Sequence, residues 1–88
     1  MSSVSDLKVE NLKVSPNPFS SFTSVEIPKD FQKGSVSVKN AFGEILQNIP
    51  FEESQYYTID GSLFPSGIYF IEILSEDKRR MIAKIVKK

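Results

Sequence analysis

The sequence alternates between apolar and polar residues in short runs, and it shows almost no helical periodicity. Val25 and Ile27 flank Glu26, and Val36 and Val38 alternate with polar neighbours. Such alternation is typical of strands with one face on a core and the other in water. Five further runs either alternate in this way or are rich in strand-forming residues. They are Asn11–Ser15, Glu44–Ile49, Tyr56–Asp60, Ile68–Leu74 and Arg80–Val86. The pattern predicts an all-β domain, an immunoglobulin-like β-sandwich of about seven antiparallel strands.

Two of these runs have distinct characters. Ile68–Leu74 is apolar on both faces except at Glu72, which predicts a central, well-covered strand. The closing segment Arg80–Lys88 is basic, and six of the eleven basic residues lie between Lys78 and Lys88. We expect an exposed edge strand that its lysines protect from aggregation. The functional alternative is a docking strip for an acidic or anionic partner.

The turns are specified more sharply than the strands. Gly43, within Asn40–Glu44, is expected to supply a positive φ that closes a hairpin through a type I turn and a bulge. The prolines of Pro16-Asn17-Pro18 cannot donate to a ladder, which predicts a rigid corner where the Asn17 side chain supplies hydrogen bonds instead. A change of alternation near residues 10–11 indicates a bulge there or the end of a linker.

Composition excludes several classes of function. Eleven basic and eleven acidic residues cancel, which argues against nucleic acid as a partner. The chain has no cysteine and no histidine, so it offers no disulfide, no thiolate metal site and no usual general base. We therefore expect no enzyme, no catalytic residue, no metal and no cofactor. No apolar run approaches the ~20 residues of a membrane span, and residues 1–5 do not form a signal peptide.

Two further groups of residues were candidates for chemistry. The adjacent carboxylates Glu52-Glu53 and Glu76-Asp77 are expected to be solvated turn charges, because acid–base catalysis needs carboxylates that converge across a cleft. Tyr56 and Tyr57 are neighbours in a strand, so one ring should face outward. An exposed ring could bind sugar, and a surface-binding module for carbohydrate or adhesion is the alternative function.

Five segments in this order resemble one known family. The chain is similar to the type A C-terminal sorting domain of the type IX secretion system of Bacteroidetes. The residues that carry the resemblance are Leu12–Phe19, with its Pro-Asn-Pro, then Val36–Glu44, Tyr57–Asp60, Leu63–Ile71 and Lys84–Lys88. On this basis residues 1–11 are a polar linker or a start added to the domain, and residues 12–88 are the sorting domain.

The resemblance implies an address signal rather than an activity. The parent protein would be exported to the periplasm, pass the outer-membrane translocon, and reach the cell surface or the medium. A cell-surface sortase would usually cut upstream of Leu12. The expected partners are the translocon and the sortase, and the oligomeric state stays open. The recognition residues implied by the resemblance are Pro16, Asn17, Pro18, Gly43, Gly67, Tyr69, Lys84, Lys87 and Lys88.

Overall fold

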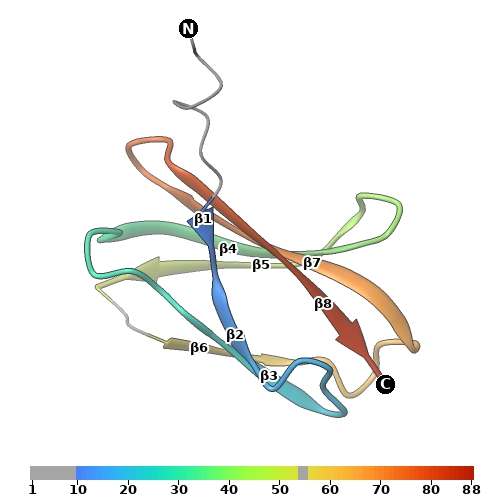
Figure 1. Cartoon of the computed structure of the whole chain (residues 1–88). Coiled ribbons are helices and arrows are strands. Elements are labelled where there is room, and N and C mark those ends of the chain that lie inside the picture. Colours follow the sequence, from blue (N-terminus) through green and yellow to red (C-terminus); the bar gives the residue numbers. More distant parts are fainter. Residues whose placement is uncertain (1–9, 54–55) are drawn as a thin grey trace, which may run out of the picture.

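The computed structural model of the chain describes residues 10–53 and 56–88, which form two packed β-sheets (Figure 1). The five-stranded sheet has the order β1-β8-β7-β4-β5, and the three-stranded sheet has the order β2-β3-β6. The strands are β1 (Glu10–Asn11), β2 (Lys13–Ser15), β3 (Phe22–Glu26), β4 (Lys33–Asn40), β5 (Ile45–Glu52), β6 (Tyr56–Asp60), β7 (Gly67–Ser75) and β8 (Arg80–Lys87). The predicted immunoglobulin-like sandwich is confirmed. Across the described ranges no helix long and apolar enough to cross a membrane occurs.

The first predicted strand is divided between the two sheets. β1 pairs in parallel with β8 at Met81 and Ile82, whereas β2 pairs antiparallel with β3. Leu12 lies between them and is buried in the core. The change of alternation near residues 10–11 therefore marks the point where the chain crosses from one sheet to the other. The remainder of the expected linker, residues 1–9, lies outside the described residues.

The core fills the space between the sheets and is built from alternate residues of the strands. Its members are Leu12, Phe19, Val25, Ile27, Phe31, Val36, Val38, Phe51, Ile59, Tyr69, Ile71, Ile73, Met81 and Ile85. The core-facing residues come from both sheets, as in other two-layer sandwiches.

β7 is central in its sheet, as predicted, because it pairs with β4 on one side and β8 on the other. The prediction that both faces are well covered is wrong. Ile71 and Ile73 face the core and are fully buried, but Ile68 and Leu74 on the opposite face are 42% and 44% exposed. The three-stranded sheet covers only one side of the five-stranded sheet, so the other side faces outward.

Candidate recognition surface

The segment around the two prolines lies against the edge of the last strand. The Asn17 Nδ2 group donates a hydrogen bond to the Lys84 carbonyl at 3.1 Å, and Asn17 Oδ1 accepts one from the Val86 amide at 2.9 Å. Phe19 then continues the pairing, because its amide donates to the Val86 carbonyl and its carbonyl accepts from the Lys88 amide, both at 2.9 Å. Pro16 and Pro18 have no amide hydrogen to donate. The Asn17 side chain therefore supplies hydrogen bonds that the prolines cannot, as expected. That it does so as a neighbour of the final strand was not predicted.

Side chains fix this segment from the core side and from the surface. The Phe19 ring is fully buried, and the buried Thr23 hydroxyl donates to the Pro16 carbonyl at 2.8 Å. The Lys87 ammonium group donates to the Ser20 carbonyl and lies 6.0 Å from the centroid of the Phe19 ring. The segment is thus held in one position relative to the final strand.

The prediction of an exposed edge strand at Arg80–Lys88 is wrong. β1 covers the edge of β8 at Met81 and Ile82, and the segment from Asn17 to Phe19 covers it farther along. Figure 1 shows the C-terminal end of β8 beside the connection between β2 and β3. The strand edge could not be read from the sequence because the residues that cover it lie more than sixty positions away.

The three lysines at the end of the chain differ in their surroundings. Lys87 contacts Ser20 and Phe19, as described above, and is half-buried. Lys84 and Lys88 are exposed, and neither takes part in the ion pairs found in the described part of the chain. Among the described lysines of this strand, Lys84 and Lys88 are therefore the exposed ones, whereas the Lys87 ammonium group is bound to the Ser20 carbonyl.

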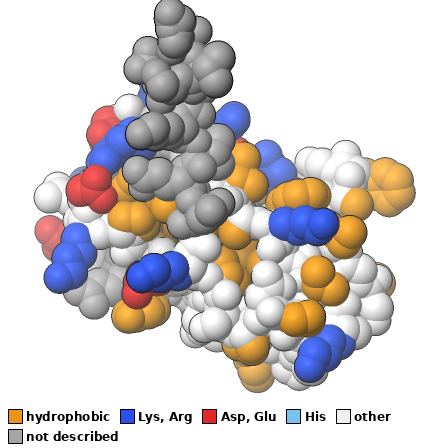
Figure 2. Space-filling model, viewed as in Figure 1, with side chains coloured by type: hydrophobic (Ala, Val, Ile, Leu, Met, Phe, Trp, Pro, Cys, Tyr) orange, Lys and Arg blue, Asp and Glu red, His pale blue; other side chains and the backbone are white. Residues whose placement is uncertain are grey.

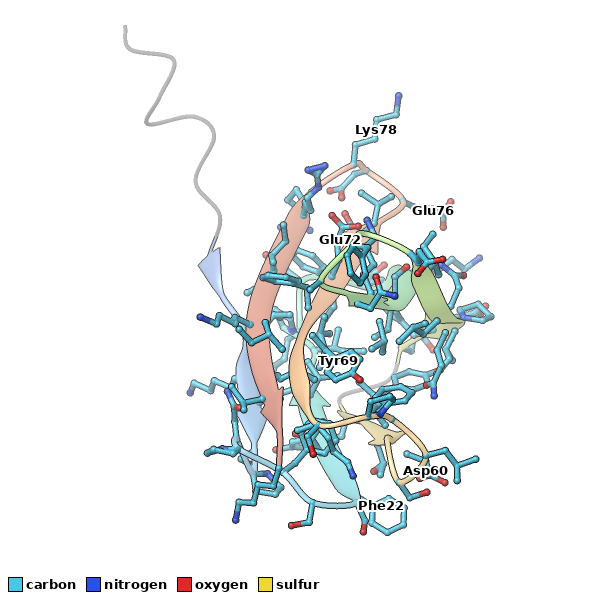
Figure 3. All side chains as sticks on the ribbon, turned by 90° about the vertical axis from the view of Figure 1, so that its right-hand side faces the viewer. Phe22, Asp60, Tyr69, Glu72, Glu76 and Lys78 are labelled. Carbon is cyan, nitrogen blue, oxygen red and sulfur yellow. The ribbon has the colours of Figure 1, made fainter. Side chains whose placement is uncertain are left out.

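Gly67 and Tyr69 shape the start of β7 next to the same strand. Gly67 pairs with Lys87 and has a φ of 147°, a conformation that side chains rarely adopt. Tyr69 is only 5% exposed, and its hydroxyl donates to the Pro65 carbonyl at 2.5 Å while its ring stacks on Phe64. Figure 3 shows Tyr69 in the middle of the molecule, between the labelled side chains of Glu72 and Asp60. Tyr69 therefore holds the loop before β7 rather than presenting its ring on the surface.

Gly43 lies apart from this region, at the tip of the β4–β5 hairpin. Its φ of 85° confirms the predicted positive value, and its amide donates to the Asn40 carbonyl at 3.0 Å. Asn40 Oδ1 also accepts hydrogen bonds from the amides of Phe42 and Glu44. The pairing register shifts between Val38 and Lys39, which places the bulge at this end of the hairpin. The turn is therefore a fixed structure.

The two pairs of adjacent carboxylates, Glu52-Glu53 and Glu76-Asp77, lie near one another at the end of the sandwich opposite the Gly43 hairpin. Figure 3 labels Glu76 and Lys78 at this end. These carboxylates line a hollow of about 280 Å³ formed by Asp30, Gln32, Lys33, Glu52, Glu53, Ser75, Glu76, Asp77 and Arg79. Arg79 binds Asp30 at 2.6 Å and Asp77 at 3.0 Å, and its guanidinium lies 4.5 Å from the centroid of Phe31. The Ser75 hydroxyl and then Arg79 lower the pKa of Asp77 below its ordinary value of 3.8. These ion pairs join loops, and the described carboxylates form no cluster suited to a metal ion.

Of the two tyrosines in β6, one faces outward as expected. The Tyr56 ring is 62% exposed, and its hydroxyl donates to Glu26 at 3.2 Å. Tyr57 is half-buried, donates to the Pro50 carbonyl at 2.7 Å and meets Phe51 edge-on. Tyr57 thereby joins the edges of β5 and β6.

The comparisons with known proteins bear on the fold and on the family of the chain. Among curated proteins none matches the chain. One similar solved structure is a DUF3244 family protein with an immunoglobulin-like β-sandwich fold from Bacteroides vulgatus ATCC 8482. It has a TM-score of 0.70 and 15% identity over 92% of this chain and 100% of that chain, which shows the fold alone. The model of the secretion system C-terminal sorting domain matches residues 13–88. The chain therefore belongs to the family of C-terminal sorting domains of the type IX secretion system.

Proposed function

We propose that this domain directs a cargo protein through the type IX outer-membrane translocon, and that a cell-surface sortase then removes it. Family membership supports the coarser role, a C-terminal sorting signal on a secreted cargo. The cargo would cross the periplasm in transit and finish at the cell surface or in the medium. Because the domain is the substrate of the sortase, it needs no catalytic residues of its own.

One observation supports a folded recognition surface over a linear tail. Asn17 and the final strand, which the family resemblance implicates separately, are hydrogen-bonded to each other through Lys84 and Val86. A partner that contacts Pro16–Pro18 would therefore meet the Lys84–Lys88 strand in the same place. We expect Gly67 and Tyr69 to act by fixing the loop beside this surface, and Gly43 to act by closing the separate β4–β5 hairpin.

The proposal is tested by fusing the full chain to a periplasmic reporter that carries its own signal peptide, in a host with a type IX system. We expect the reporter outside the cells, and we expect it to stay in the periplasm when Lys84–Lys88 are deleted. A periplasmic reporter with the full chain, or normal export without these residues, would refute the sorting function. Mass spectrometry of the released fragment tests the sortase step, since a cut downstream of Leu12 contradicts it.

A non-catalytic module that binds carbohydrate or mediates adhesion is the second candidate, because the Tyr56 ring is 62% exposed. Exposed aromatic rings can stack on sugars. Glycan-array binding by the full chain that disappears in Tyr56→Ala would support this function. No binding by the full chain would remove this function, and unchanged binding in the variant would exclude Tyr56 as the binding platform.

A further inference from the structure

We infer that the outer face of the five-stranded sheet docks a protein partner that presents apolar side chains framed by carboxylates. The docking surface, here called the apolar strip, consists of Phe42, Ile45, Leu46, Ile68, Phe70 and Val86. The inference rests on the proposed function, because it gives the chemistry of the partner that would bind the sorting domain.

Four of the six strip residues are exposed, and Phe70 and Val86 are half-buried. Phe42 is 90% exposed, Ile45 is 59% exposed, and Leu46 and Ile68 are each 42% exposed. In Figure 2 hydrophobic side chains gather on the hairpin that projects at the right of the molecule. Single exposed apolar residues are normal, but a contiguous patch that is rimmed by polar groups marks an interaction site.

Strand register joins these residues across the sheet. Ile45 lies opposite Lys39, and Lys39 lies opposite Phe70 on the next strand. Phe70 in turn lies opposite Lys84, and Ile68 lies opposite Val86. Residues paired in this way point to the same face of a sheet, so Ile45, Phe70, Ile68 and Val86 share the outer face. Lys39 of β4 lies between Ile45 and Phe70 in this row, so the strip combines apolar and basic side chains. It ends on the final strand, which the proposed function already implicates.

The charges on this face indicate an acidic partner. Glu72 lies beside the strip and binds both Lys39 at 3.1 Å and Arg80 at 2.9 Å. Lys84 has no ion pair within the described ranges, so three cations surround one carboxylate where the strip crosses β4, β7 and β8. The other charges near this face are already matched, because Lys33 pairs with Glu52 and the Glu44 carboxylate accepts a hydrogen bond from Asn40. A complementary partner would therefore carry carboxylates around its apolar groups. In a second copy the same face would carry the same excess of positive charge, and two such faces repel each other, which disfavours self-association.

The β4–β5 hairpin, which carries the most exposed residues of the strip, is held by hydrogen bonds of the Asn40 side chain. Asn40 binds the amides of Phe42 and Glu44 through Oδ1, and its Nδ2 group donates to the Glu44 carboxylate at 2.8 Å. A surface that is already ordered loses little conformational entropy on binding. Phe42 and Ile45 are therefore suited to act as anchors.

The test uses the full chain fused to the exported reporter and places acidic residues in the strip. We expect Ile45→Asp combined with Ile68→Asp to lower export at least about tenfold. A tenfold loss of affinity corresponds to about 1.4 kcal/mol of binding free energy, within the range lost when anchor residues are replaced. Ile45→Lys with Ile68→Lys removes the same apolar groups but adds charge that an acidic partner tolerates, so it should export more than the Asp pair. Leu63→Asp, at a 95% exposed loop position off the sheet, is the matched control and should export normally.

The outcomes separate this inference from the proposed function. If the unaltered chain is not exported, the sorting function itself fails. If it is exported and the Asp pair is exported equally well, or the Asp and Lys pairs lose export equally, the docking inference is overturned. Lys84→Glu repeats the test at an exposed side chain, in case the double variants do not fold, and should also reduce export. A dimer of the purified chain that Ile45→Asp dissociates would identify a second copy as the occupant and overturn the inference as well.

Discussion

The Asn17 side chain accepts a hydrogen bond from the backbone amide of Val86 at 2.9 Å, although the two residues are 69 positions apart. The same side chain donates to the Lys84 carbonyl. This contact joins the entrance of the domain to its last strand and satisfies backbone groups that an edge strand would otherwise leave to water. The two ends of the sorting domain are thus one structural unit.

Replacing Asn17 should weaken that unit measurably. We expect Asn17→Ala to lower the free energy of unfolding by about 1–2 kcal/mol, because two hydrogen bonds to backbone groups are lost. Hydrogen exchange of the Val86 amide should accelerate more than that of Ile71 in the central strand. Ser20→Ala is the control, since it keeps the Ser20 carbonyl that accepts from Lys87, and it should change stability by less than about 0.5 kcal/mol. Equal effects from the two substitutions would contradict this role of Asn17.

Gly67 should be sensitive to any side chain. At a φ of 147° with open space around it, Gly67→Ala introduces backbone strain without a steric clash, and we expect a loss of about 1–3 kcal/mol. Gly43→Asn should cost less, because asparagine tolerates the left-handed region near a φ of 85°. Urea denaturation of both variants tests this order, and a larger loss at Gly43 would be evidence against it.

Glu72 should contribute to stability as the shared partner of two cations. Its side chain is 16% exposed, and it binds Lys39 and Arg80 from the strands on either side. We expect Glu72→Gln to lower the free energy of unfolding by about 1–2 kcal/mol, between the effects of exposed and buried pairs. Glu26→Gln is the matched control, because Glu26 is more exposed and lies 3.9 Å from Lys13, and it should have little effect. Chemical denaturation at low and high salt measures both, and a salt-independent loss of the same size in the two variants would argue against the network.

Acid should weaken the end of the sandwich that contains Asp77. The pKa of Asp77 is lower in the folded chain than its ordinary value of 3.8, chiefly because the Ser75 hydroxyl and then Arg79 bind the ionised form. A lowered pKa contributes stability above the unfolded value and loses it as the pH falls through the folded value. The melting temperature should therefore fall below about pH 4, and Asp77→Asn should reduce that fall. An unchanged pH profile in Asp77→Asn, with Glu76→Gln as the control, would exclude this contribution.

Local features of the fold could be predicted from the sequence, and non-local ones could not. The turn from Asn40 to Glu44 was predictable because the positive φ that it requires is supplied by Gly43, and its hydrogen bonds form within the same five residues. The alternation at Val25 and Ile27 and at Val36 and Val38 predicted side chains that face the core, and all four are buried.

The two wrong predictions, an exposed edge at β8 and a β7 covered on both faces, concern features that depend on residues distant in the sequence. The edge of β8 is covered by Asn17 and Phe19, and nothing near Lys84 in the sequence indicates this. The exposed outer face of β7 also follows from the number of layers, which an apolar run alone does not specify. The family resemblance selected Asn17 and Lys84 as site residues, and the structure brings them into contact through the Lys84 carbonyl.

The most direct test of the central claim is the fraction of a reporter found outside the cell when it carries the full chain. The measurement compares a host with an intact type IX translocon and the same host without it. We expect extracellular reporter only in the intact host and periplasmic reporter in the other. Periplasmic reporter in both hosts, or extracellular reporter in both, would contradict the assignment of this chain as a sorting signal.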